Sequence, residues 1–546
     1  MNIYLFLLKT KRTSCSTFAA MKRFLLISLH LSVLLATACD RNFWLSRSED
    51  VDYSGSIPHE MIVLGDKLDD PYTVANMTKA CASLYPAKAG RGQLLPTHFY
   101  VRFLPSDDDQ YERLVNACGN LLDHPMDYEV VREGDWYHDP EVSEDRITWQ
   151  YTVVPEDFMF PSDIRYELLD SCYIPDSSTK GDGIDWAAVE REAFRMTGNE
   201  QMLLSSGTKA SEGSKVPAGR ITVSDPDYSS EPAGLKGALV SCNTFVKFCN
   251  VYTDEDGNYQ MTKSFASEPR YRIIFKNVKG FGIGFNLLLL PASASTLGKC
   301  SNEGVDVEIS AASERKMFLR AAVNNAAYDY WESCKSTDGN SISTPPSNLR
   351  IWLFHSLARS SSVMLQQGAF VDSSFIGNFL GEYVSLLKMF LPDITIGVKQ
   401  MNSYAEVYAT TVHELAHASH FAKAGKTYWD EYIKYIMKSF VTSGFVTYGV
   451  GTEENSGYCE VGEMWAYYME TKMYRERYAG SDKVFGTSYW FSPQILMNLD
   501  DKGLDRYHIF QALGTDVVDK DVFQDKMLSL YPQFKANINQ AFGRYN

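Results

Sequence analysis

The chain is poor in positive charge and in histidine. Its 52 lysines and arginines are outnumbered by 68 aspartates and glutamates, so the formal net charge is −16 at pH 7. This acidic balance argues against nucleic acid or an anionic membrane surface as a main partner. With only 10 histidines in 546 residues, two histidines at a metal-binding spacing are informative.

No segment has the length and apolarity of a membrane-spanning helix, and the apolar run Phe24–Leu35 is too short. The run follows Met21 and two cations and precedes small residues, as in a secretory signal peptide. Residues 1–38 are therefore the expected signal peptide, with Met21 as the true start. The small residues before Cys39 resemble a bacterial lipobox. The resemblance implies a lipid on Cys39 and anchoring in the bacterial cell envelope, at the outer membrane or cell surface; plain cleavage and secretion is the alternative.

Metal-finger spacing is absent from the cysteines that follow Cys39. In an exported chain some of them could pair, and Cys242 and Cys249 could face each other across a hairpin. Their scatter defines no disulfide pattern.

The length predicts roughly two to four domains. Residues 39–56 are polar and are expected to form a tether, and residues 57–200 an α+β domain. The elements expected in this domain are strands at His98–Pro105, Met126–Glu133 and Ile147–Pro155 and a helix at Asp107–Gly119. A Ser/Gly/Lys-rich linker at 201–217 follows.

Residues 218–311 contain short strand signals with an Asp256-Gly257 turn, which predicts an all-β sandwich. The order of these strands resembles the carboxypeptidase regulatory-like family, which has a transthyretin-type fold. That resemblance implies a non-catalytic module. Residues 313–546 are mainly helical in pattern, with short strands at Leu349–Phe354 and Ile394–Lys399. The second strand is the candidate cleft edge for an extended substrate. The expected fold class is multidomain α+β.

The motif with the clearest chemistry is His413-Glu414-Leu415-Ala416-His417. Residues i and i+4 of a helix share one face, so His413 and His417 can bind one metal ion. Glu414 is rotated by about 100° and can reach water instead. Between Val407 and Phe421 the only charge is Glu414, as a buried helix requires. Gly425 is the expected end of this helix.

A catalytic zinc needs a third protein ligand. The metzincin pattern fails, because Lys423 stands where its third histidine should be, and His420 is expected to be a second-layer or core residue. The stretch Glu463–Glu470 reads Glu-Met-Trp-Ala-Tyr-Tyr-Met-Glu and resembles the second zinc helix of the gluzincins. That resemblance implies Glu463 as the third ligand, with Glu460 as the rival. It also implies an inserted helix near Tyr428–Ser439.

The sequence therefore predicts a Zn²⁺-dependent peptidase with Glu414 as general base, acting on a peptide or protein. Endopeptidase activity is favoured over exopeptidase activity. Candidate oxyanion donors are Tyr468, Tyr458 and His508. Two alternatives stay open. One is a catalytically silent surface protein that binds a glycan or protein. The other is a closed structural metal site with His420 or Glu460 as fourth ligand.

Overall fold

The computed structural model describes most of the chain beyond residue 60. The described residues are 61–87, 94–119, 121–143, 146–175, 183–203, 214–285, 292–312, 314–335, 341–354, 357–358, 360–364, 367–368, 392–442 and 448–545. The expected signal peptide, the tether, Cys39 and most of the linker lie outside these residues.

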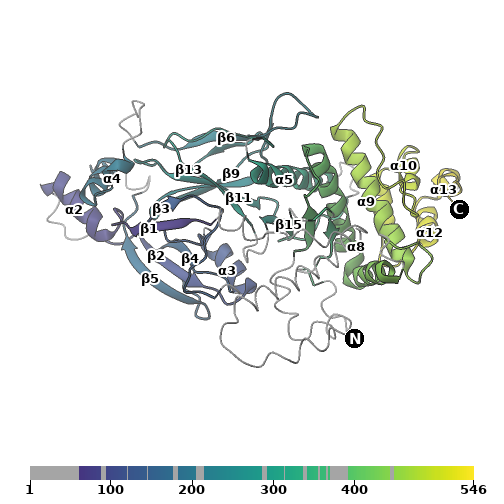
Figure 1. The fold of residues 1–546 in the computed structure, drawn as a ribbon, viewed down its shortest axis with the longest axis horizontal. Helices are drawn as coiled ribbons and strands as arrows, with labels where there is room; N and C mark the ends of the chain where they lie inside the picture. The colour runs from purple at the N-terminus through teal and green to yellow at the C-terminus, as the bar shows by residue number, and fades with distance from the viewer. Residues whose placement is uncertain are drawn as a thin grey trace, which may run out of the picture.

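The N-terminal region, drawn in purple and blue in Figure 1, combines helices with two small antiparallel sheets. One sheet has the order β4 (Gln150–Pro155), β2 (His98–Leu104), β5 (Arg165–Cys172), and the other pairs β1 (Val63–Lys67) with β3 (Tyr128–Arg132). The helices are α2 (Val74–Leu84), α3 (Asp108–Cys118) and α4 (Trp186–Met196), and the short helix η3 (Glu200–Met202) follows.

Helix α3 shows why the local prediction worked. The Asp107 side chain accepts a hydrogen bond from the backbone N–H of Gln110 at the start of the helix, and Gly119 ends it with a φ of 74°. The α+β character expected for this region is confirmed.

Two sheets that share one core follow the linker. The smaller has the order β10 (Asn258–Gln260), β6 (Ala218–Val223), β14 (Val307–Ile309), with β7 (Ala233–Gly234) also paired to β6. Strands of the larger are β8 (Ala238–Thr244), β9 (Lys247–Tyr252), β11 (Arg270–Asn277), β12 (Gly282–Phe285) and β13 (Ala294–Lys299). Cys242 and Cys249 lie opposite each other in β8 and β9, as expected.

The larger sheet continues into the last third of the chain. Its order is β16-β17-β15-β12-β11-β8-β9, where β15 is Arg350–Phe354, β16 is Ser361–Ser362 and β17 is Ile394–Gly397. The sheet thus crosses the boundary expected between residues 311 and 313. The expectation that Ile394–Lys399 forms the edge of a cleft is wrong, because β17 is paired on both sides; among the described residues, β16 is the outermost strand. A two-residue strand carries too little alternation to be recognised from sequence.

Helices dominate the C-terminal region, which confirms the mainly helical prediction. They are α5 (Arg315–Ser333), α8 (Tyr404–Thr442), α9 (Ser456–Arg477), α10 (Gln494–Asp500), α11 (Arg506–Ala512), α12 (Lys520–Leu530), the short η5 (Pro532–Phe534) and α13 (Lys535–Phe542). Helices α8 and α9 pack side by side (Figure 1).

Helix α8 bends sharply at Gly425, whose backbone is non-helical with a φ of 80°. The expected helix stop therefore occurs at this residue. A second helical stretch then continues through the predicted Tyr428–Ser439 insertion and turns its aromatic side chains back toward the first stretch.

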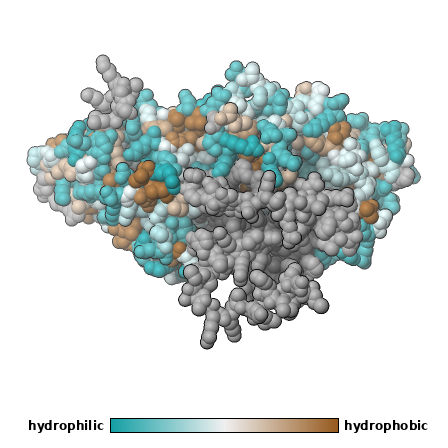
Figure 2. All heavy atoms as spheres, viewed as in Figure 1, coloured by the Kyte–Doolittle hydropathy of each residue, from teal (hydrophilic) through white to brown (hydrophobic). Residues whose placement is uncertain are grey.

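Hydrophilic residues cover much of the coloured surface in Figure 2. Among the described residues, no helix has the length and apolarity that a membrane crossing requires.

Candidate metal centre

His413, His417 and Glu463 meet between the first stretch of α8 and the middle of α9. One ligand atom from each residue lies within 4.8 Å of the other two, and all three residues are buried. The periodicity of both helices explains the meeting, since Val412, Leu415 and Ala416 on α8 and Met464 and Trp465 on α9 are also buried. The structure thus brings together the three residues expected from the sequence.

The distances among the three side chains suit a tetrahedral metal. The two Nε2 atoms of His413 and His417 are 3.2 Å apart. Glu463 Oε2 is 3.5 Å from His413 Nε2, and Glu463 Oε1 is 3.4 Å from His417 Nε2. Two ligand atoms bound at about 2.0–2.1 Å in a tetrahedral site lie about 3.3–3.4 Å apart. The donor set of two imidazoles and one carboxylate therefore fits zinc.

The charges around the site attract a cation. Burial would lower the pKa of His413, but hydrogen bonds to Glu463 and Glu470 raise it well above its usual value. Burial opposes ionisation of Glu463, yet the neighbouring His417 and His413 hold its pKa well below the usual range. The carboxylates thus favour a positive charge at the imidazole nitrogens, carried by a proton when no metal ion is bound. A metal ion would replace that proton.

Glu470 orients the first ligand. Its Oε2 lies 3.1 Å from His413 Nδ1, and both side chains are buried. Hydrogen bonding at Nδ1 leaves Nε2 free to face Glu463. This carboxylate–imidazole pairing is the usual support of a metal-binding histidine. For His417 Nδ1, no hydrogen-bond partner exists among the residues that the structure describes.

The inserted helical stretch supports the third ligand. The Tyr432 hydroxyl donates a hydrogen bond of 2.6 Å to Glu463 Oε1. The rings of Tyr432 and Trp429 pack against the His417 ring at centroid distances of 5.8 and 5.7 Å. Because the chain bends at Gly425, Trp429 and Tyr432 can pack against His417 although they follow it closely in sequence.

Glu414 lies next to the site and is held by the edge strand. The Ser362 hydroxyl donates a 2.7 Å hydrogen bond to Glu414 Oε2. The Trp429 indole N–H in turn donates to the Ser362 carbonyl over 3.2 Å. Burial raises the pKa of Glu414, while His413 and His417 oppose that shift. A carboxylate with a raised pKa beside a metal site is suited to carrying a proton.

The proposed oxyanion donors do not reach the three ligands. The Tyr468 hydroxyl donates to Asp500 Oδ2 over 3.1 Å, and His508 Nδ1 is 2.7 Å from Asp505 Oδ1. The Tyr458 ring packs on Tyr428. Because Tyr468 is offset by about 100° from Tyr467, it faces away from the ligands.

Tyr467 occupies the position that faces the ligands. Its ring lies 4.4 Å from that of His413, centroid to centroid. Its hydroxyl is 3.5 Å from the Tyr448 hydroxyl. The sequence reasoning did not assign Tyr467 a place beside the first ligand.

His420 and Glu460 do not complete a four-ligand site. His420 is fully buried against the rings of Tyr428 and Trp429, and burial lowers its pKa to about 3. Glu460 Oε2 instead accepts a hydrogen bond from the backbone N–H of Lys520. Within the described residues, the metal-type cluster contains three members, which leaves a position open as in catalytic sites.

No protein-family model matches this chain. Neither the curated proteins nor the solved structures contain a significant match to it. The functional argument therefore rests on the residues of the site.

Proposed function

We propose that this protein is a zinc-dependent peptidase. The observation that carries the proposal is the convergence of His413, His417 and Glu463 at tetrahedral spacing, with Glu414 beside them. When bound, zinc would supply Lewis acidity, which makes water a stronger acid and polarises a substrate carbonyl. The three buried side chains hold the ion and leave one position open.

The chain's own proton carrier is Glu414. Its carboxylate accepts a proton from the attacking water and returns it to the leaving amine. The Ser362 hydroxyl holds Oε2, so the other carboxylate oxygen is free to receive the proton. Burial of Glu414 excludes bulk water that would otherwise compete for this exchange.

A peptide is the favoured substrate because an edge strand runs beside the base. Within the described ranges, strand β16 is the last strand of the eight-stranded sheet, and its Ser362 contacts Glu414. An edge strand can pair with an extended peptide through backbone hydrogen bonds, which would present a peptide carbonyl to the site. This arrangement supports an endopeptidase, because such pairing requires no free terminus.

The experiment is hydrolysis of an unfolded protein by the purified chain. Cleavage should stop with a zinc chelator and return with added Zn²⁺. Cleavage that survives complete removal of the metal would refute a zinc peptidase. A chain that binds zinc but never cleaves would favour the alternative of a silent surface protein that binds a glycan or protein.

The sequence features outside the site complete this proposal. We take Cys39 as the lipid-bearing residue of an envelope-anchored protein and residues 218–311 as the regulatory-like module. Cys39→Ala should move the protein from the membrane fraction to the soluble fraction of its cells. Unchanged membrane association of this variant would exclude the lipid anchor.

A further inference from the structure

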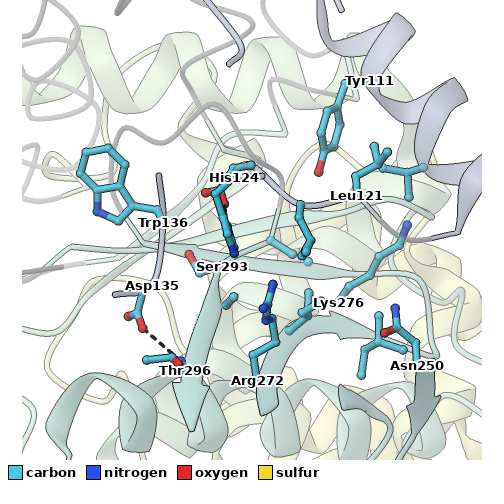
Figure 3. A pocket seen from close by; sticks show the side chains of 18 of the residues that line it. Tyr111, Leu121, His124, Asp135, Trp136, Asn250, Arg272, Lys276, Ser293 and Thr296 are labelled. Carbon is cyan, nitrogen blue, oxygen red and sulfur yellow. Dashed lines mark hydrogen bonds and ion pairs between the residues drawn. The ribbon is translucent and has the colours of Figure 1, made fainter. Parts of the chain in front are cut away.

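A cavity lies between the N-terminal region and the outer face of the large sheet, and it shares no residue with the metal centre (Figure 3). Its volume is about 120 Å³, room for about four water molecules at the density of the liquid. Helix α3 and residues 121–136 contribute one wall, and strands β8, β9, β11 and β13 the other. Cavities between domains are frequent sites of small-molecule binding.

Strand β11 places a row of cations on the cavity wall. Arg270, Arg272 and Lys276 alternate with Tyr271, Ile273 and Phe275, which are fully buried in the core behind. Because side chains alternate across a strand, the cations share the face toward the cavity. Burying charged side chains on a covered face of a central strand destabilises the fold unless those charges have partners.

Arg272 lacks a carboxylate partner. Its side chain is directed from β11 toward His124 on the other wall (Figure 3), and the residue is only 6% exposed. Its single hydrogen bond within the described residues runs from Nη2 to Asn243 Oδ1 over 3.0 Å. Burial lowers its pKa to about 10, with Asp123 opposing. The guanidinium remains a cation at neutral pH, with donors left over.

The acidic side chains of the cavity are engaged elsewhere. Glu133 pairs with Arg270, Asp135 pairs with Arg320 over 3.0 Å, and Glu112 pairs with Arg350 over 3.8 Å. Asp123 accepts from the backbone N–H of Tyr137 over 2.6 Å and lies 2.8 Å from His124 Nδ1. The charge of Asp123 still favours the cationic form of Arg272, but among the described residues no hydrogen bond or ion pair joins the two side chains.

Lys276 also lines the cavity, and no ion pair of its ammonium group is found among the described residues. It is partly buried, and burial lowers its pKa, with Glu112 opposing. Together Arg272 and Lys276 give the cavity two cations that can accept a negative group. Much of the remaining lining is apolar, with Leu121, Trp136 and Phe248 among its members.

We propose that this cavity binds a small organic anion, a carboxylate attached to a compact apolar body such as a single aromatic ring. The carboxylate forms a bidentate pair with the Arg272 guanidinium, and Lys276 adds positive charge to the same cavity wall. The apolar body packs against the aromatic and aliphatic lining. A fully hydrated inorganic anion fits less well, because that lining offers it no compensation for lost water.

The test uses titration calorimetry on the full chain with monocarboxylates and their neutral amides, including phenylacetate and phenylacetamide. We expect a carboxylate to bind below about 10 mM and at least about tenfold more tightly than its amide. Equal binding of acid and amide, absence of binding by every carboxylate, or tighter binding of inorganic phosphate would overturn the proposal. Zinc removal should leave the affinity unchanged, which separates this site from the proposed catalytic one.

Variants locate the binding. Arg272→Met should weaken carboxylate binding at least about tenfold and raise the melting temperature of the ligand-free chain, because it removes an unpaired buried charge. Lys276→Met should weaken binding as well and serves as the second variant if Arg272→Met fails to fold. The control is Arg195→Gln on the exposed face of α4, where Arg195 pairs with Glu192. If the control loses as much carboxylate affinity as the cavity variants do, the ligand does not bind in this cavity.

Discussion

Replacing Glu470 by glutamine tests how the first zinc ligand is oriented. The substitution keeps an oxygen that can accept from His413 Nδ1, at present 3.1 Å away, but removes the negative charge. Loss of such a supporting carboxylate lowers metal affinity by about tenfold to a hundredfold, which corresponds to about 1.4–2.7 kcal/mol. The contact is fully buried, so solvent does not screen the lost charge.

The assay is competition for Zn²⁺ against a chromophoric chelator of known affinity. The matched control is Glu460→Gln, which lies on the same helix but contacts Lys520 rather than a ligand. We expect Glu470→Gln to bind zinc about ten to a hundred times more weakly and the control to bind like the wild type. Equal zinc affinity for Glu470→Gln and the wild type would refute the orienting role. A deficit shared by both variants would indicate general damage to α9.

Two further predictions follow from buried groups. Tyr432→Phe removes the 2.6 Å hydrogen bond to Glu463 and should weaken zinc binding about threefold to tenfold in the same competition assay, since such a bond contributes about 1 kcal/mol; an unchanged affinity would contradict this role. Burial raises the pKa of Asp70 from 3.8 to about 8, so the folded chain keeps a proton that the unfolded chain releases between those pH values. The free energy of unfolding should therefore fall as pH rises from about 4 to about 8, by a few kcal/mol from this group. Asp70→Asn has no carboxyl to titrate, so its melting temperature should fall less between these pH values than that of the wild type. Parallel curves of melting temperature against pH for the two proteins would show that Asp70 does not cause the loss of stability.

The sequence predicted the parts of the site that depend on one helix. His413, Glu414 and His417 are related by helical spacing, and the shortage of charge around them predicted burial. Glu463 required a resemblance between helices, because nothing local relates it to His417. A helix end at Gly425 and an inserted helix after it were also predicted, although the sharp bend and the contacts of the inserted stretch were not.

The missed contacts all depend on how separate elements pack. Glu470 carries no sequence signal for its partner, which comes from α8. Ser362 is in a two-residue strand, and its place beside Glu414 follows from the order of a sheet that joins distant segments. The choice of Tyr468 over Tyr467 was an error of about 100° around α9, which the mixed aromatic pattern of that helix could not resolve. Strand pairing is set by tertiary contacts, and for the same reason β17 was misplaced at the edge.

The central claim is a metal site with a separate proton carrier, and Glu414→Gln tests it most directly. Zinc content and hydrolysis of an unfolded protein should be measured on the same samples of wild type and variant. The account predicts one zinc per chain in both and loss of nearly all turnover in the variant, because Glu414 contacts Ser362 rather than the ligand atoms. Full activity in Glu414→Gln, or absence of zinc from the wild type after metal loading, would contradict the account.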